Sequence, residues 1–471
     1  MQGAILTAAM FDRIALTLFA AAATVAAQSA GPKTMRLDYY HAGTAAEEHF
    51  AIDRVSIEGE WPGPLDRWID TSNLGKYQFE VFDAASHRAI YSRGFASVYG
   101  EWETTDEAKQ KWRSLHESVR FPAPDAPVQV VVRKRGSKNE WVPIWSVNVD
   151  PSDRTIDRSS PPKVNVWPVM RNGAPRDKVD LLLLGDGYTA SEMEKWHGDA
   201  KHTAEVLFAA SPFREHRGDF NVWAVDTPSD ESGVSRPSDN VYRRSALGAA
   251  YDAFGSERYV LTLDNRRLRE IASAAPYEFM EIVVNDRKYG GGGIFNAFAT
   301  VSAGNAFTPY VLVHEFGHHF AGLADEYYTS DVSYGSPTDR PEPWEPNATA
   351  DPQAAKWKEL LTPAVALPTL WPKQEFERMQ QDTQSRRREI RARHQPEDVM
   401  EALFREELAS DTKLLSSGAN AGKVGAFEGA MYEAKGYYRP QQDCIMFTRD
   451  EVGFCAVCRR AIERVIAMYA K

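Results

Sequence analysis

The chain has 471 residues, of which 43% are hydrophobic and 26% are charged, and this near-average composition excludes global disorder, a collagen-like repeat and a coiled-coil rod. Lys and Arg number 55 against 66 Asp and Glu, and the formal net charge of −11 argues against general binding to nucleic acid or anionic membranes. At roughly 150 residues per domain, the length predicts two to three domains.

An apolar run near the N-terminus predicts a signal peptide. Residues 14–27 read IALTLFAAAATVAA and follow Arg13. The run is too short for a membrane span but has the length of a signal-peptide core, and its small residues suit cleavage after Ala27. We therefore expect residues 1–27 to be removed and the mature protein to be secreted or periplasmic, with no membrane span. A buried N-terminal helix is the alternative.

Residues 35–150 have the pattern of a small β-sandwich. Short stretches of alternating polar and apolar residues are separated by turn residues, which is typical of strands. Residues 105–118 are expected to form a helix between these strands. Residues 151–168 are rich in Pro, Ser and Asp and are predicted to be a linker.

The spacing of apolar residues along the sequence changes in residues 169–471. The apolar run at residues 179–184 (VDLLLL) is typical of a strand buried on both faces, and a capping box at the start of residues 189–210 predicts a helix. Alternating strands and helices indicate an α/β domain. Within it, the strongly charged residues 371–408 are expected to form a solvated helical insertion, broken near Pro396.

The segment His314-Glu315-Phe316-Gly317-His318 is a HExxH sequence. Residues four apart lie on one face of a helix, so the two imidazoles can meet a single Zn²⁺ ion. Glu315 sits beside them, where it can take a proton from a water molecule. The pattern predicts a catalytic zinc centre, and the alternative is a core helix with two hydrogen-bonded histidines.

Two histidines leave a catalytic zinc ion one protein ligand short. Gly322 can adopt the left-handed conformation that ends a helix and turns the chain back. Asp325 or Glu326 would then reach the metal, and we favour Asp325. His319 points about 100° away from His318 around the helix, so we expect it to pack or to face substrate.

Residues 314–328 (HEFGHHFAGLADEYY) resemble the metzincin-type zinc peptidases and, more narrowly, metallopeptidase family 64, the IgA-peptidase family. The resemblance implies a metzincin-like α/β (α+β) catalytic domain. It also implies that zinc is held by His314, His318 and Asp325, with Glu315 as general base. The common metzincin signature places its glycine seven residues and its third ligand ten residues after the first histidine, whereas here they fall at eight and eleven.

Two further features fit that resemblance. Met446 suits the methionine-containing turn that metzincins carry beneath the metal, and an ordinary core methionine is the alternative. Tyr437 or Tyr438 could donate a hydrogen bond to the oxyanion of a tetrahedral intermediate, with aromatic packing as the alternative.

A glycine run follows a predicted strand and lacks the ending of a phosphate-binding loop. The resemblance to zincins suggests that it borders the cleft, where a substrate backbone could pair along it; a flexible turn is the alternative. The residues concerned are Gly291, Gly292 and Gly293.

The three cysteines, Cys444, Cys455 and Cys458, are clustered near the C-terminus. In an exported protein an odd count allows at most one bridge, and we expect a disulfide from Cys444 to one of the other two. A structural metal site is the alternative, but the sequence offers no obvious fourth ligand.

Together these features predict a secreted zinc metalloendopeptidase with one catalytic Zn²⁺ ion and protein or peptide substrates. A zinc amidase acting on peptidoglycan or glycoconjugates is one alternative. A non-catalytic zinc-binding protein is another, although such a protein has no need of Glu315. The N-terminal sandwich could be a carbohydrate- or protein-binding module. The sequence gives neither the cleavage preference nor the oligomeric state.

Overall fold

The N-terminal part of the described chain consists of strands in two antiparallel sheets. The computed structural model describes residues 31–329, 340–450 and 452–471, so the predicted signal peptide lies outside the described residues. One sheet has the order β2-β1-β5 and the other the order β4-β3-β6-β7. The strands are β1 (Lys33–Gly43), β2 (Glu48–Glu60), β3 (Tyr77–Asp83), β4 (Ala89–Phe95), β5 (Arg113–Pro122), β6 (Val128–Arg135) and β7 (Trp141–Val149).

Both N-terminal sheets contribute to one apolar core. Every second side chain of β3 is buried, beginning with Tyr77. Leu37 of β1, Phe79 of β3, Phe121 of β5 and Val130 of β6 belong to the same buried cluster. Period-two alternation places these side chains on the inner faces of two packed sheets.

The helix predicted at residues 105–118 is wrong, because residues from Arg113 onward belong to β5. Leu115, Glu117 and Val119 are buried while the residues between them are less so, which is the period of a strand. The short helix of this region is α1 (Val98–Trp102), whose first turn is capped by Ser97.

The C-terminal part is built on a six-stranded sheet of order β14-β15-β13-β9-β10-β8. Its four inner strands are parallel, and the edge strands β8 and β14 run antiparallel to their neighbours. The last residues of the predicted linker already belong to β8. The strands are β8 (Val166–Met170), β9 (Val179–Asp186), β10 (Phe220–Val225), β13 (Phe279–Val284), β14 (Gly291–Ile294) and β15 (Phe298–Ser302).

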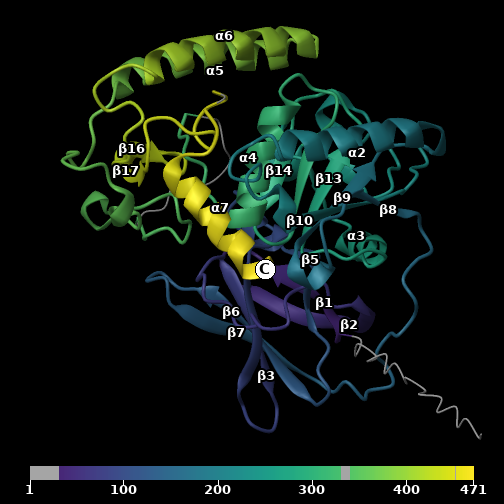
Figure 1. Cartoon of the computed structure of the whole chain (residues 1–471). Helices are drawn as coiled ribbons and strands as arrows, with labels where there is room; N and C mark the ends of the chain where they lie inside the picture. Colours follow the sequence, from purple (N-terminus) through teal and green to yellow (C-terminus); the bar gives the residue numbers. More distant parts are fainter. Residues whose placement is uncertain (1–30, 330–339, 451) are drawn as a thin grey trace, which may run out of the picture. The chain divides into compact units, whose positions relative to one another are not determined.

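The run VDLLLL forms the buried strand β9, as predicted. Leu181 and Leu183 face the core that contains α2, α4 and α7 (Figure 1). Leu182 and Leu184 face the core that contains α3 and α1. The sheet is therefore covered on both faces, which explains the continuous apolar run. The helices are α2 (Met193–Leu207), α3 (Asn265–Ala272), α4 (Thr308–Ala321) and α7 (Ala456–Tyr469).

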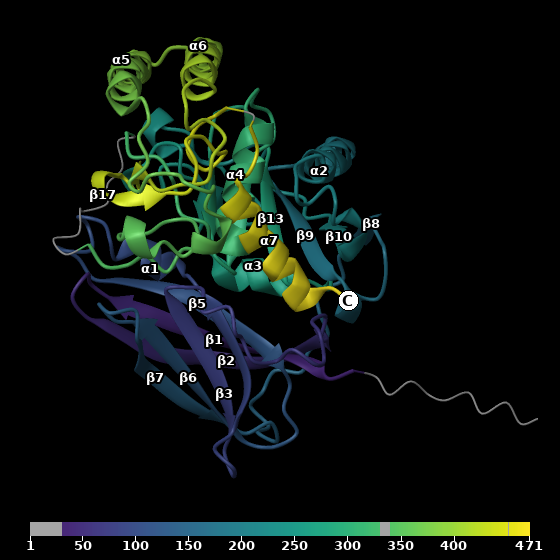
Figure 2. The same ribbon diagram turned by 60° about the vertical axis from the view of Figure 1, so that its left-hand side comes forward.

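The charged segment predicted to be helical forms two helices, α5 (Lys373–Ala392) and α6 (Glu397–Leu415), which lie side by side (Figure 2). They are separated at Pro396, and α6 continues beyond the predicted end. Met400, Leu403 and Phe404 of α6 belong to the core cluster of the six-stranded sheet. The insertion is therefore anchored by an apolar stripe.

Two small hairpins complete the described part, β11 (Ala249–Ala250) with β12 (Leu261–Thr262), and β16 (Phe427–Ala430) with β17 (Glu433–Arg439). The two sheet regions are joined directly, since Ala96 N–H donates to Phe295 O (2.9 Å). The fold is thus mixed α/β, preceded by an all-β region. Among the described helices, none combines the length and apolarity needed to cross a membrane.

Candidate active site

The HExxH sequence lies on α4, which packs against the sheet beside β14 and β15. Pro309 sits in the first turn, where its missing N–H costs nothing. The helix ends at Gly322, which has a φ of +59°. A Cβ there would also lie 2.6 Å from the ring of Trp344, so only glycine suits this turn.

Three side chains converge just beyond this turn: His314, His318 and Asp325, which we call the histidine cluster. Asp325 Oδ1 lies 3.0 Å from His314 Nε2 and 3.2 Å from His318 Nε2. The two Nε2 atoms are 3.1 Å apart. The structure therefore brings together the three residues predicted as metal ligands.

Backbone carbonyls fix the orientation of both imidazoles. His314 Nδ1 donates to Ile445 O (2.9 Å), and His318 Nδ1 donates to Leu323 O (2.5 Å). Because a carbonyl only accepts, each proton is on Nδ1 and each Nε2 lone pair faces the centre of the cluster. This donor set fits a divalent cation such as Zn²⁺.

The electrostatics of the histidine cluster also favour a cation. Burial raises the pKa of Asp325, but His318 and His314 more than offset this and hold it well below 3.8. Burial lowers the pKa of His318, yet the Asp325 carboxylate overcomes that effect and raises it to about 9. The aspartate is therefore ionised, and the centre of the cluster favours a positive charge.

Asp325 and its neighbour Glu326 point in different directions. Glu326 is fully buried, and its Oε1 accepts from Asn347 Nδ2 (2.9 Å). It also lies 3.3 Å from Cys458 Sγ. Of the two carboxylates considered as third ligand, the structure places Asp325 with the histidines.

His319 is a packing residue with both ring nitrogens occupied. Its Nδ1 donates to Ile294 O (2.9 Å), and its Nε2 accepts from Met280 N–H (3.1 Å). Complete burial lowers the pKa of His319 to about 3, so the ring is neutral.

A cavity of about 190 Å³ opens beside the histidine cluster. Glu315 and His318 line it from α4, and Asp325 lines it from the following turn. The all-β region contributes Ala96, Glu101 and Thr105 to the wall. Potential metal ligands and an adjacent carboxylate, Glu315, therefore lie together beside one cavity.

The glycine run forms β14 and lies directly against α4. A Cβ on Gly293 would be 2.2 Å from Glu315 O, and one on Gly291 would be 2.6 Å from Val311 Cγ1. A Cβ on Gly292 would be 2.5 Å from Tyr259 Cε2. These residues are glycines because the helix and Tyr259 approach so closely.

The predicted pairing of substrate along this run needs a correction. Gly291 N–H donates to Arg258 O, and Gly291 O accepts from Val260 N–H, both at 3.1 Å. Residues 258–260 therefore occupy the outer edge of β14 at Gly291. Gly291 and Gly293 still line the cavity, whereas Gly292 does not belong to the described lining.

Tyr437 and Tyr438, predicted as oxyanion donors, lie elsewhere. Tyr437 is buried, and its hydroxyl donates to Pro341 O (3.1 Å). The backbone of Tyr438 pairs with Thr349. These contacts keep both tyrosines in strand β17, outside the described lining of the cavity.

Tyr432 is the tyrosine that sequence reasoning missed. It lines the cavity, and its hydroxyl donates to Asp325 Oδ2. Met431 and Tyr432 both have positive φ in the turn between β16 and β17, and their N–H groups donate to Asp325 O and Tyr327 O. No local sequence signal predicts two non-glycine residues in this conformation.

Two further groups border the cavity or lie behind it. Arg258 Nη2 donates to Tyr327 OH (2.8 Å), and both residues line the cavity. Glu281 of β13 is buried behind Glu315, and neither of its oxygens has a hydrogen-bond partner among the described residues. Burial and, after it, the nearby Glu315 raise the pKa of Glu281 well above its ordinary value, which favours the neutral form of this carboxyl group.

Met446 lies in a turn beneath α4. The turn is closed by a hydrogen bond from Phe447 N–H to Cys444 O (2.8 Å), and Met446 is fully buried. Its Sδ is 3.2 Å from the point where a Cβ of Gly317, the residue before His318, would stand. Met446 thus packs below the helix that carries both histidines, and its assignment to a methionine turn stays a prediction.

The expected disulfide is not formed. All three cysteines are buried free thiols, and Cys444 Sγ lies 3.9 Å from Cys458 Sγ. An S–S bond of about 2.05 Å would require the two side chains to move together.

The geometry agrees with comparisons to known families. The family model described as IgA Peptidase M64 matches residues 168–466, and the model of the Peptidase M64 N-terminus matches residues 27–146. A search of curated proteins found no match. Since the first model alone covers more than half of the chain, this protein belongs to the IgA peptidase M64 family.

Proposed function

We propose that the protein is a secreted, zinc-dependent metalloendopeptidase with a metzincin-like catalytic domain. The observation that carries the proposal is the convergence of His314, His318 and Asp325. Two of these residues, His318 and Asp325, line one cavity together with Glu315. Family membership supports a peptidase, and the predicted signal peptide supports export.

The three ligand residues would hold one Zn²⁺ ion and leave a fourth position open toward the cavity. A bound zinc ion supplies Lewis acidity, which polarises a carbonyl group and acidifies water. Ile445 O and Leu323 O hold the imidazoles in the tautomer that binds metal.

Glu315 acts as the general base. Its carboxylate accepts a proton from the attacking water and returns that proton to the leaving amine. Glu281 behind it is buried, and its raised pKa favours the neutral form, which limits repulsion between the two carboxyl groups.

Tyr432 replaces Tyr437 and Tyr438 as the proposed oxyanion donor. Its hydroxyl already lies at Asp325 Oδ2 on the cavity wall, so a rotation of the side chain can present it to a substrate oxyanion. Protein or peptide is the substrate class we propose, because the family to which the chain belongs is a family of peptidases.

The test compares the mature wild type with Glu315→Ala, both with metal content measured, by mass-spectrometric profiling of a mixed peptide library. We expect cleavage by the wild type and a loss of about 10²–10⁴-fold in the variant, the usual contribution of a general base. No cleavage by the zinc-loaded wild type would contradict the proposal. Release of products from peptidoglycan or glycoconjugate alone would instead favour a zinc amidase.

A further inference from the structure

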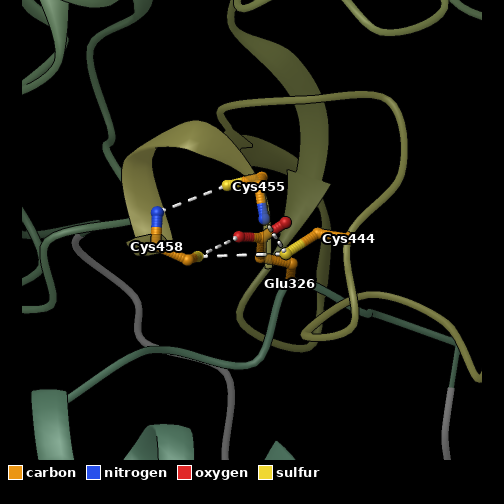
Figure 3. A group of neighbouring side chains, drawn as sticks. All are labelled: Glu326, Cys444, Cys455 and Cys458. Carbon is orange, nitrogen blue, oxygen red and sulfur yellow. Dashed lines mark hydrogen bonds between the residues drawn. The ribbon is translucent and has the colours of Figure 1, made fainter. Parts of the chain in front are cut away.

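A second group of potential metal ligands lies away from the cavity. Glu326, Cys444, Cys455 and Cys458, which we call the cysteine cluster, meet in the interior with all four side chains buried (Figure 3). Their ligand atoms all lie within 4.8 Å of one another. They come from three segments: the turn after α4, the turn that holds Met446, and the start of α7.

The distances within the cysteine cluster suit a tetrahedral metal ion. Cys444 Sγ and Cys458 Sγ are 3.9 Å apart, and Cys458 Sγ is 3.3 Å from Glu326 Oε1. Around zinc with Zn–S bonds of about 2.3 Å, two sulfurs stand roughly 3.8 Å apart. A disulfide among three cysteines would leave one buried thiol unpaired.

Backbone groups already turn toward the sulfurs. Cys455 N–H donates to Cys444 Sγ (3.3 Å), and Cys458 N–H donates to Cys455 Sγ (3.4 Å) (Figure 3). Cys455 and Cys458 also stand at the N-terminus of α7, a helix of 14 residues whose dipole favours negative charge there. These contacts stabilise thiolates, the form of cysteine that binds metal.

Glu326 is a potential fourth ligand that the sequence did not reveal. Its Oε1 accepts from Asn347 Nδ2, while its Oε2 is buried with no hydrogen-bond partner in the described part of the chain. An unpartnered buried carboxylate oxygen is costly unless a cation compensates it. The nearby buried guanidinium of Arg439 offsets part of the negative charge of the cluster.

We propose that Glu326, Cys444, Cys455 and Cys458 bind a second Zn²⁺ ion that is structural. All four tetrahedral positions are filled by protein, so the site is closed to substrate. Because its ligands come from three segments, the ion would link α7 to the segments that carry Asp325 and Met446. A hydrogen bond from Glu326 N–H to Met446 O (2.8 Å) already joins two of these segments. This proposal goes beyond the proposed hydrolysis, because the second zinc ion takes no part in the reaction.

The test measures zinc in the mature wild type, purified without added metal and dialysed against metal-free buffer, by inductively coupled plasma mass spectrometry. We expect two zinc ions per chain. A mercurial that modifies thiols should release one of them to a chromogenic zinc indicator, because only one is bound through sulfur. The double variant His314→Ala/His318→Ala should keep one zinc ion, and the mercurial should release it.

Cys458→Ser gives the complementary result, one zinc ion that the mercurial does not release. If this variant does not fold, the wild-type measurement decides. One zinc ion in the wild type with no release by the mercurial would overturn the proposal. So would an intact mass lower by that of two hydrogens, the mark of a disulfide. Loss of peptidase activity bears only on the histidine cluster, so failure of the two proposals can be distinguished.

Discussion

The histidine cluster and the cysteine cluster are separated by a single peptide bond, that between Asp325 and Glu326. Successive side chains of an extended segment point to opposite sides, so one carboxylate joins the histidines and the other joins the cysteines. The first cluster borders a cavity and the second is buried. A metal site with a coordination position left open suits catalysis, whereas a site fully coordinated by protein suits a structural role.

Replacing each of the two neighbouring carboxylates by the corresponding amide gives the sharpest test of this difference between the clusters. We expect Asp325→Asn to remove peptidase activity, by about 10³-fold or more as the metal is lost, with little change in thermal stability. Glu326→Gln should lower the free energy of unfolding by about 2–4 kcal/mol, because a buried ligand to the proposed ion is lost. Peptide cleavage and thermal unfolding of both variants provide the measurement, and equal effects in both assays would remove the distinction.

Tyr432→Phe tests whether the open cluster has the proposed oxyanion donor. We expect kcat to fall by about 10²-fold with little change in KM, since the hydroxyl would act mainly in the transition state. Tyr437→Phe is the matched control, because its hydroxyl bonds to Pro341 O, and it should leave kcat nearly unchanged. A larger loss in the control would return the role to Tyr437.

Gly293→Ala tests the packing that positions the open cluster. The added Cβ would stand 2.2 Å from Glu315 O, so α4 must move away from β14. We expect a loss of about 1–3 kcal/mol in the free energy of unfolding, together with reduced activity. Gly198→Ala is the control, because it lies in α2 with nothing within 4 Å of the new atom, and it should be neutral or stabilising. Urea unfolding of both variants checks this.

A pH titration of the all-β region, which contains neither the histidine cluster nor the cysteine cluster, has the smallest expected effect. His41 is buried between Glu117 and Glu48, and these carboxylates outweigh burial and raise its pKa above 6.5. The stabilisation from charged His41 is therefore complete below pH 6.5 and is lost as the pH rises through the higher folded pKa. Thermal unfolding above pH 6.5 should show this loss in the wild type and not in His41→Gln. An unchanged pH dependence in the variant would refute it.

The sequence predicted the parts of the site that depend on local pattern. The spacing of His314 and His318 on a helix, the turn at Gly322 and the buried run of β9 all follow from short-range periodicity and backbone chemistry. Asp325 could be anticipated because it follows that turn directly.

The residues that the sequence missed depend on contacts between distant segments. Glu326 meets Cys444 and Cys458 only after α7 and the Met446 turn have packed beside α4. Tyr432 reaches Asp325 through a hairpin turn with an unusual backbone conformation. Neither arrangement corresponds to a periodicity or spacing that can be recognised in the sequence.

The cavity wall formed by Ala96, Glu101 and Thr105 has a consequence for protein engineering. A truncated chain that begins at the six-stranded sheet would keep Glu315 and the proposed zinc ligands, but the cavity would lack one of its walls. Substrate selectivity would then depend on both regions, because each contributes side chains to the cavity wall. Chimaeras between members of the family should exchange both regions together, since an N-terminal all-β region from another member would bring its own side chains to the cavity wall.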